Sequence, residues 1–367
     1  MKWKETIKGL KAYEPGKPIE AVKKEFGLTE ITKLASNENP LGCSPKVAAF
    51  LRENDFNFAL YPDGYAQTMR TAVANHVGIS EKEVLFGNGS DEIISIISRS
   101  LLSPDTNTVM ASPTFSQYKL NAVIEGAEVR EIPLNEKREH DLDAMFDAID
   151  EKTAVVWVCS PNNPTGGVTP NAAIERFLEK VPNDVLVVLD EAYIEYVTDP
   201  TYQDTLPLFK KHENVLLMRT FSKAYGLAAF RVGYAIGQQS LLSKLEPVRA
   251  PFNNTVISQA IIPIALEDQT YIEKCRQIND EGRKQYVAFC EKHQLDYYPS
   301  NTNFILFEIK ADSNEVFQEL MTRGYIVRSG AALGVPNYLR VTIGTAEQNA
   351  GLLAQLEEIL ASKGVLV

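Results

Sequence analysis

From about residue 60 onwards, short apolar runs alternate with longer segments in which apolar and polar residues follow a helical spacing. The apolar runs cover residues 109–111, 155–158, 185–189 and 215–218, and each is uninterrupted. Strands that are apolar on both faces are typical of a parallel sheet covered by helices on both sides. Residues 90–102 begin with polar residues and continue with apolar pairs, which predicts a helix. The alternation therefore predicts an α/β architecture.

The pattern changes after residue 268. A charged segment from about residue 269 to His293 predicts a long helix. The segments after it predict a strand at 304–307, a helix, strands around Ile326 and at 339–343, and a final helix from Thr345. A chain of 367 residues is too long for one minimal core. We therefore expect three parts: an N-terminal arm with part of a small domain (1–50), a large domain (51–268) and a C-terminal small domain (269–367).

Composition and charge narrow the class of protein. The hydrophobic fraction of 44% and the charged fraction of 23% are ordinary for a globular protein. The formal net charge of -11 argues against nucleic-acid binding, which needs clustered lysines and arginines. A local group of arginines can still bind a small anion despite that overall charge.

Cysteines and histidines indicate no metal site and no disulfide framework. The four cysteines have no C-x-x-C spacing, so we expect reduced thiols, as in cytoplasmic proteins. None of the four histidines has a ligand spacing to another. The N-terminal residues contain no apolar run of the kind found in secretory signals. The longest apolar stretch, residues 257–266, is too short to span a membrane.

The first candidate motif is F-G-N-G-S-D-E, residues 86–92, a glycine-rich turn between a predicted strand and a predicted helix. The backbone amides of Gly89, Ser90 and Asp91 would point at an anion at the positive end of that helix. A plain helix cap by Asn88 or Ser90 explains the same letters.

The second motif, S-P-N-N-P-T-G at residues 160–166, follows a predicted strand directly. Its prolines and glycine make a rigid turn at the edge of the sheet where α/β proteins bind ligands. Asn163 lies within it and has an amide that would donate a hydrogen bond to a phenolate oxygen. A purely structural turn is the alternative.

The third motif, L-D-E-A-Y at residues 189–193, ends the most apolar of the predicted strands. A buried carboxylate is costly unless it is paired. Asp190 would be paired by the protonated nitrogen of a pyridine ring, and Tyr193 would reach the same phenolate as Asn163. A salt bridge or a metal ligand from Asp190 or Glu191 is the alternative.

The fourth motif is T-F-S-K-A-Y-G-L-A-A-F-R, residues 220–231. Lys223 follows a serine, lies among small and aromatic residues, and precedes an arginine by eight positions. A lysine is a nucleophile only when burial or a nearby cation lowers its pKa from about 10.4. The segment predicts a Schiff-base lysine beside a phosphate site made by Ser222 and Arg231.

Together and in this order, the four motifs resemble those of fold-type I pyridoxal-phosphate enzymes, and specifically of aminotransferases. Further segments resemble the histidinol-phosphate aminotransferase family: L-A-S-N-E-N-P-L-G (34–42), Y-P-D-G (61–64), S-P-T-F-S-Q-Y (112–118), S-K-A-Y-G-L-A-A-F-R-V-G-Y (222–234), and the segments around Arg328 and Arg340. The resemblance extends over nearly the whole chain. It departs at Ala229, where the family usually has glycine, and at Phe115, where tyrosine is common.

The resemblance implies a large pyridoxal-phosphate-binding domain with a mostly parallel seven-stranded sheet, and a smaller α/β domain. It also implies roles for the cofactor site. Lys223 would bind the cofactor covalently and move a proton, Asp190 would keep the ring an electron sink, and Tyr193 and Asn163 would tune the phenolate. The phosphate would be held by Gly89, Ser90, Asp91, Ser222 and Arg231, and Phe115 would stack on the ring, unless it is simply a core residue.

The resemblance further implies a homodimer with shared active sites. Tyr61 would reach the cofactor phosphate of the neighbouring subunit, although Y-P-D-G also reads as an ordinary turn. Substrate binding is implied for Arg340 and Arg328, whose forked donors suit a carboxylate or a phosphate, and for Asn37 and Tyr13. A packing role in the arm is the alternative for Tyr13.

The expected reaction transfers the amino group of L-histidinol phosphate to 2-oxoglutarate and gives imidazole-acetol phosphate and L-glutamate. An aromatic or broad-specificity aminotransferase and a threonine-phosphate decarboxylase are the alternatives with similar motifs. A transcriptional regulator that keeps this fold would need a basic DNA-binding module ahead of it. Only about sixty residues precede Tyr61, and the chain is acidic, so we do not expect a regulator.

Overall fold

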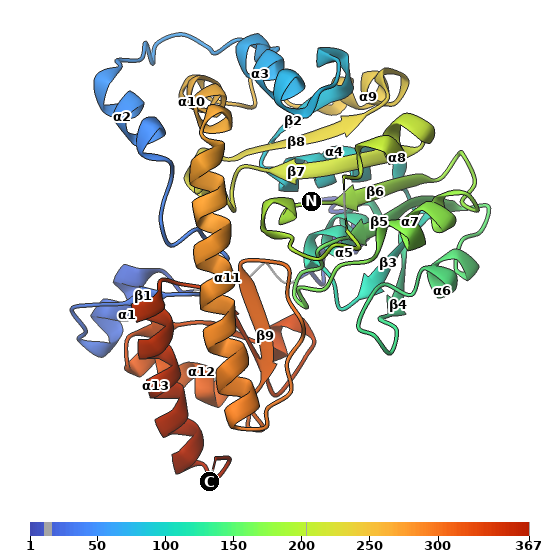
Figure 1. The fold of residues 1–367 in the computed structure, drawn as a ribbon. Coiled ribbons are helices and arrows are strands. Elements are labelled where there is room, and N and C mark those ends of the chain that lie inside the picture. The colour runs from blue at the N-terminus through green and yellow to red at the C-terminus, as the bar shows by residue number, and fades with distance from the viewer. Residues whose placement is uncertain (11–16, 203, 367) are drawn as a thin grey trace.

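The structure is a computed structural model that describes residues 1–10, 17–202 and 204–366. The chain forms a large lobe built on one extended sheet and a smaller lobe with short strands (Figure 1). Helix α11 (Gln269–Lys292) runs along both lobes. It matches the predicted charged helix and ends one residue before the predicted end at His293. The predicted domain boundaries at residues 50 and 268 stay predictions.

The sheet of the large lobe has seven strands in the order β2-β8-β7-β6-β5-β3-β4. Strand β8 is antiparallel to both of its neighbours, and the remaining pairs are parallel. The prediction of a mostly parallel seven-stranded sheet is therefore confirmed. The strands are β2 (Val84–Asn88), β3 (Asn107–Ser112), β4 (Glu128–Pro133), β5 (Thr153–Cys159), β6 (Leu186–Asp190), β7 (Val215–Thr220) and β8 (Val232–Gly237).

Helices cover both faces of this sheet, and this explains the uninterrupted apolar runs. Neighbouring residues of a strand point to opposite faces. Val156 and Val158 accordingly belong to one core, with α3, α7, α8 and α10, and Val155 and Trp157 belong to the other, with α4, α5 and α9. The helices of the large lobe are α2 (Pro45–Glu53), α3 (Gln67–Val77), α4 (Ser90–Leu101), α5 (Ser116–Glu125), α6 (Leu142–Asp147), α7 (Asn171–Leu178), α8 (Leu206–Lys211), α9 (Gln239–Leu245) and α10 (Val256–Glu267).

The smaller lobe combines the two ends of the chain. Its antiparallel sheet has the order β11-β12-β9, and a separate parallel pair joins β1 near the N-terminus to β10. Its elements are α1 (Ile19–Phe26), β1 (Thr32–Lys33), β9 (Phe304–Glu308), α12 (Ser313–Thr322), β10 (Tyr325–Ile326), β11 (Arg328–Ser329), β12 (Tyr338–Thr342) and α13 (Ala346–Ser362). Short 3-10 helices lie at Glu5–Ile7, Glu81–Glu83, Ile194–Tyr196, Ala228–Phe230, Glu246–Val248 and Ala331–Leu333. Among the described residues, no helix combines the length and the apolar character needed to cross a membrane.

The segment of residues 34–42 crosses from the smaller lobe to the large one. At its start, the Leu34 amide donates to the Ile326 carbonyl at 2.7 Å. Farther along, the Asn39 side-chain amide donates to the Ala224 carbonyl at 2.8 Å. Its last residue, Gly42, meets Gly226, which has a φ of 67°. A Cβ atom on Gly226 would lie 1.9 Å from the Gly42 carbonyl oxygen, so the crossing requires glycine at this position.

We expect Gly226→Ala to lower the free energy of unfolding by more than about 2 kcal/mol. The backbone at residue 226 would have to move away from Gly42, and the alanine would also have to adopt a strained φ. Gly78→Ala is the matched control, since Gly78 also has a positive φ but a Cβ there would meet nothing within 4 Å. We expect that control to cost roughly 1 kcal/mol. Denaturant unfolding measures both, and equal losses would contradict the close contact.

Candidate active site

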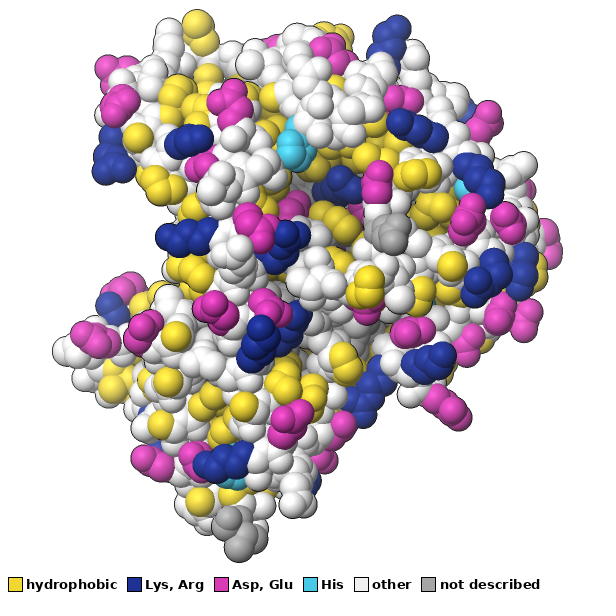
Figure 2. Space-filling model, viewed as in Figure 1, with side chains coloured by type: hydrophobic (Ala, Val, Ile, Leu, Met, Phe, Trp, Pro, Cys, Tyr) yellow, Lys and Arg dark blue, Asp and Glu magenta, His cyan; other side chains and the backbone are white. Residues whose placement is uncertain are grey.

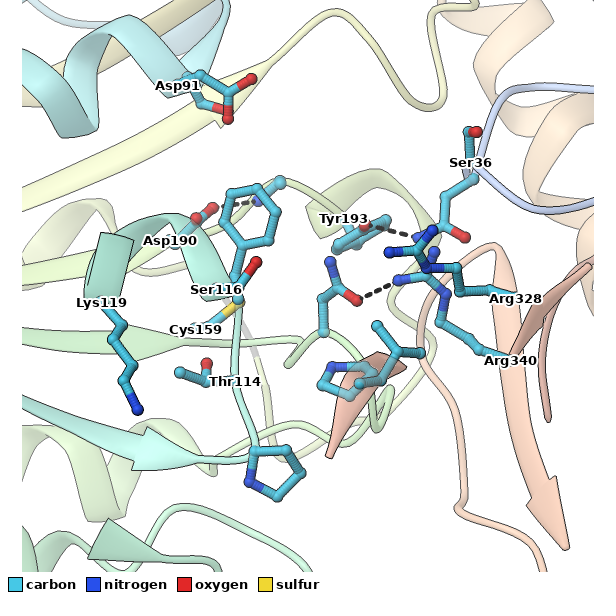
Figure 3. A pocket seen from close by; sticks show the side chains of 18 of the residues that line it. Ser36, Asp91, Thr114, Ser116, Lys119, Cys159, Asp190, Tyr193, Arg328 and Arg340 are labelled. Atoms are coloured by element: carbon cyan, nitrogen blue, oxygen red, sulfur yellow. Dashed lines mark hydrogen bonds between the residues drawn. The ribbon is translucent and has the colours of Figure 1, made fainter. Parts of the chain in front are cut away.

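A cavity of about 360 Å³ lies at the carboxyl ends of the sheet strands, where the smaller lobe meets the large one. Residues from all four motifs and from the smaller lobe line it. Figure 3 shows Asp91, Asp190 and Tyr193 of the large lobe on one side, facing Arg328 and Arg340 of the smaller lobe. The predicted site residues that it brings together are Asn37, Ser90, Asp91, Phe115, Asn163, Asp190, Tyr193, Ser222, Lys223, Arg231, Arg328 and Arg340.

Lys223 is carried by the loop that follows β7. Its Nζ lies 3.4 Å from the Ser36 carbonyl oxygen and 5.7 Å from the centre of the Tyr193 ring. Burial, together with the positive charge of Arg340, lowers the pKa of Lys223 to about 8. An amine with this pKa is neutral in about a tenth of the molecules at neutral pH, whereas an ordinary lysine is almost fully charged. The environment therefore makes Lys223 a usable nucleophile and base.

Asp190 is the last residue of β6 and is only 3% exposed. Its Oδ2 accepts a hydrogen bond from the Tyr118 hydroxyl at 2.5 Å, and its Oδ1 accepts one from the Ala192 amide at 3.1 Å. Burial raises the pKa of Asp190 to about 6, and these two hydrogen bonds oppose that effect. A buried carboxylate facing a cavity is suited to pair with a cationic group of a bound molecule.

Asn163 and Tyr193 are both oriented by hydrogen bonds. Arg340 donates from Nη1 to Asn163 Oδ1 at 2.6 Å, and because a guanidinium only donates, the other amide atom of Asn163 is its NH₂ group. Asn37 Nδ2 donates to the Tyr193 hydroxyl at 3.0 Å, which leaves the tyrosine proton to be donated elsewhere. Thr342 in turn donates to Asn37 Oδ1 at 3.1 Å. Two donors, Asn163 and Tyr193, thus stand on the cavity wall.

An anion cradle forms where β2 ends and β8 begins. Gly89 caps α4 with a φ of 75°, and its amide donates to the Arg231 carbonyl at 3.0 Å. Arg231 Nη1 lies 3.4 Å from Ser222 Oγ, and Nη2 lies 3.3 Å from Asp91 Oδ2. Gly89 has a ψ of 170° together with its positive φ, a conformation that essentially only glycine adopts, so glycine is favoured there. The helix N-terminus, the hydroxyl and the guanidinium converge as a phosphate site requires.

Two arginines of the smaller lobe reach the opposite end of the cavity. Arg328 on β11 is the register partner of Arg340 on β12, so the two residues lie directly opposite on neighbouring strands. Their labelled side chains approach one another beside Ser36 in Figure 3. Like charges in opposite positions on a sheet are unfavourable. Two guanidinium groups at these positions could together bind an anion with several oxygens.

Comparisons with known proteins agree with this geometry. The sequence profile of the family Aminotransferase class I and II matches residues 29–356. A histidinol-phosphate aminotransferase from Lysinibacillus sphaericus (strain C3-41) is 66% identical over 365 residues, covering 100% of both chains. The chain belongs to the histidinol-phosphate aminotransferase family of class I and II aminotransferases.

Two further relatives extend the comparison of this aminotransferase. A histidinol-phosphate aminotransferase from Bacillus subtilis (strain 168) is 56% identical over 360 residues, covering 98% of this chain and 100% of the relative. The crystal structure of histidinol-phosphate aminotransferase from Sinorhizobium meliloti in complex with pyridoxal-5'-phosphate has a TM-score of 0.89 at 25% identity and covers 98% of each chain. Membership of this family implies pyridoxal phosphate as the cofactor.

Two of the predicted site residues that the structure describes do not line the cavity of this aminotransferase. Gly89 lies beside Arg231, and its amide, which was predicted to point at the phosphate, instead donates to the Arg231 carbonyl. Tyr61 is 82% exposed and stacks on Phe252, with ring centres 4.7 Å apart, outside the cavity of its own chain. Tyr13 lies outside the described residues.

Two residues that orient the predicted site had no predicted role of their own. Tyr118 holds Asp190, and Thr342 holds Asn37, which in turn holds Tyr193. Asn37 was predicted to bind substrate, and its contacts add a positioning role to that prediction. A hydrogen-bond partner that lies far away in the sequence cannot be recognised from the residues around the site. Tyr118 does, however, fall within the segment 112–118, which resembles the family.

We expect Asp190→Asn to stabilise the aminotransferase stripped of cofactor at about pH 8 by up to about 3 kcal/mol. The pKa of Asp190 is higher in the fold, about 6, than its ordinary value of 3.8. The protonated carboxyl is therefore favoured in the fold, and its contribution to stability is lost as the pH rises through about 6. Thermal unfolding against pH measures this, with Asp105→Asn at an exposed loop as the control. A gain that does not shrink towards low pH would contradict the explanation.

Proposed function

We propose that this aminotransferase transfers the amino group of L-histidinol phosphate to 2-oxoglutarate, forming imidazole-acetol phosphate and L-glutamate in histidine biosynthesis. The observation that carries the proposal is the pair Arg328 and Arg340 at opposite register positions on the cavity wall. The names of the relatives that match over their full length support the same reaction.

The cavity suits pyridoxal phosphate as the bound cofactor, which supplies an electron-accepting ring next to the carbon that loses its proton. The close approach of Gly89 to Arg231 and the buried carboxylate of Asp190 both support this assignment. We assign the covalent attachment of the cofactor to Lys223 and the contact with the ring nitrogen to Asp190. The phenolate would be bound by Asn163 and Tyr193, and the ring face by Phe115. The phosphate would be bound by Ser90, Asp91, Ser222 and Arg231.

Lys223 would also act as the acid and base of the transfer. Because its pKa is about 8, the amine would accept a proton from the α-carbon of the donor near neutral pH. The ammonium group formed in this way would then act as the acid and donate the proton again. Arg340 helps in two ways, because its charge lowers the pKa of Lys223 and its side chain orients Asn163. The positioned groups remove the need to reorganise water around the developing charges.

The alternatives differ in the substrate that the arginine pair would bind. An aromatic aminotransferase needs to hold one carboxylate, which a single guanidinium can satisfy. Two opposed arginines suit a phosphate better, since a phosphate offers more oxygens and more charge. A threonine-phosphate decarboxylase also needs a phosphate site, so the arginine pair does not separate it from the proposed reaction.

Steady-state rates with histidinol phosphate, phenylalanine, tyrosine and threonine phosphate, each with 2-oxoglutarate, test the proposal. We expect histidinol phosphate to give the highest kcat/KM, with glutamate formed in equal amount to the donor consumed. Release of carbon dioxide from threonine phosphate, or a higher kcat/KM for phenylalanine or tyrosine, would replace the proposed function by one of the alternatives.

Replacing Arg328 is a sharper test of phosphate selection. We expect Arg328→Gln to reduce kcat/KM for histidinol phosphate at least about tenfold, because a charge-assisted contact contributes about 1.5–3 kcal/mol. The loss with phenylalanine should be clearly smaller. Arg323→Gln is the matched control, since Arg323 instead pairs with Glu358 on the exposed side of the smaller lobe. Equal losses on both substrates would mean that Arg328 supports the site without selecting phosphate.

We further propose that the aminotransferase is a homodimer whose active sites each use both chains. Large apolar side chains are exposed together near Tyr61: Phe58, Leu60, Tyr65 and Phe252. The space-filling view likewise has apolar side chains exposed over the part of the large lobe that carries α2, α3 and α10 (Figure 2). Exposed apolar patches of this kind are typical of protein interfaces. Tyr61 would reach the cofactor phosphate of the partner from this surface.

Subunit mixing tests the shared site. One chain carries Tyr61→Ala with Lys223 intact, and the other carries Lys223→Ala with Tyr61 intact. A mixed dimer then has one site with both residues intact and one site that lacks both. We expect activity at limiting cofactor to rise above the sum of the two parents once the subunits exchange. No rise, with exchange demonstrated by native mass spectrometry, would mean that Tyr61 serves its own chain or has no role at the site.

A further inference from the structure

The Tyr118 hydroxyl is buried directly beneath the cavity, where no substrate or cofactor role has been assigned to it. It donates a hydrogen bond of 2.5 Å to Asp190 Oδ2, across 72 positions of the sequence. The Ala192 amide donates to the other carboxylate oxygen at 3.1 Å. A carboxylate has about four lone-pair positions, so one position on each oxygen remains to face the cavity. The two donors therefore fix the plane in which Asp190 presents its charge.

Tyr118 is itself held rigidly. Its ring is fully buried and stacks on Trp157, with ring centres 4.7 Å apart and an angle of 10° between the planes. Phe115 packs against it nearly at a right angle, with ring centres 5.6 Å apart. The indole Nε1 of Trp157 donates to Thr108 Oγ1 at 3.0 Å, which ties the stack to β3. A hydroxyl on such a support has little freedom to leave Asp190.

The charges around Asp190 leave Tyr118 as its main stabilising side chain. Asp91 on α4 and Glu191 after β6 are negative, and both raise the pKa of Asp190 in addition to burial. The neighbouring Cys159 thiol on β5 has its own pKa raised by burial and stays neutral. Burial also raises the pKa of Tyr118, so its proton remains on the oxygen and is available to the carboxylate. The Tyr118 hydrogen bond is thus the largest influence that favours the charged form of Asp190.

We propose that Tyr118 is a positioning residue that keeps the Asp190 carboxylate ionised and aligned for the ring nitrogen of the cofactor. The proposal rests on the proposed role of Asp190 towards that nitrogen. Tyr118 touches neither substrate nor cofactor in this proposal and acts through Asp190 alone.

The test measures cofactor affinity, which does not depend on turnover. Tyr118→Phe keeps the ring stack and removes only the hydroxyl. Tyr286→Phe is the matched control, because Tyr286 is also fully buried but donates to Asn349 in the smaller lobe. The sequence has two tryptophans, Trp3 and Trp157. All variants are therefore made in a Trp3→Phe background, in which Trp157, the ring that stacks on residue 118, is the remaining tryptophan. Its fluorescence reports binding when the stripped full-length chain is titrated with pyridoxal phosphate.

We expect Tyr118→Phe to weaken the affinity for pyridoxal phosphate about tenfold near neutral pH, the usual effect of losing a hydrogen bond to a charged group. The loss should shrink towards about pH 9. Without the Tyr118 hydroxyl the pKa of Asp190 is higher, but at pH 9 the carboxyl is ionised in both the variant and the parent. Thermal unfolding of the stripped variant should change no more than that of Tyr286→Phe. An unchanged affinity, or a loss that is the same at every pH, would overturn the proposal.

Asp190→Asn separates this inference from the proposed function. If Asp190→Asn leaves both the affinity for pyridoxal phosphate and the transamination rate unchanged, the proposed role of Asp190 fails, and the role of Tyr118 fails with it. If Asp190→Asn lowers both while Tyr118→Phe changes neither the affinity nor its pH dependence, only the role of Tyr118 fails.

Discussion

The guanidinium group of Arg340 connects the parts of the chain that enclose the cavity. It is only 7% exposed, donates to Asn163 in the large lobe and to the Ala35 carbonyl at 2.9 Å, and lies over the Phe304 ring. A buried cation is costly unless it is hydrogen-bonded in this way. The same charge lowers the pKa of Lys223 across the cavity. One side chain therefore contributes to the contact between the two lobes, to the orientation of an amide donor and to the lowered pKa of the amine.

The cavity is assembled at a cost to stability. Asp190 is buried with a raised pKa, and Lys223 is buried with a lowered one. Neither of these arrangements would be favourable in a protein that was selected for stability alone. The double apolar core around the sheet supplies the stability that tolerates them. Conflicts between local energetics and the fold are expected where ligands bind.

The sequence predicted the central part of the fold because central strands leave a strong signal. Each of the four apolar runs is a strand of the structure: β3, β5, β6 and β7. Strand β4 was not singled out, since it lies at the edge of the sheet, is only partly buried and alternates charged with apolar residues. Strand β8 contains two glycines and was likewise not recognised as a strand.

Most residues of the site were predicted from the sequence, but the contacts between them were not. The motifs named Asp190 and Lys223, and the family resemblance added Arg340, but the contacts that adjust these residues join distant parts of the chain. Asn37 and Tyr193 are 156 positions apart, and Arg340 and Asn163 are 177 apart. The opposition of Arg328 to Arg340 needs the register of β11 and β12, which depends on pairing and cannot be read from either segment alone.

The reversed direction of β8 also determines how the cavity comes together as the chain folds. Strands β7 and β8 are antiparallel neighbours, so the loop of residues 221–231 between them is a hairpin connection that contains Ser222, Lys223 and Arg231. Contacts within a hairpin are local and need only a short loop to close. The lysine and the anion-binding arginine are therefore brought together by neighbours in the chain, whereas Arg328 and Arg340 arrive from a hundred residues later. Of the two ends of the cavity, the phosphate end joins this hairpin to the start of α4, whereas the substrate end depends on the contact between the smaller lobe and the large one.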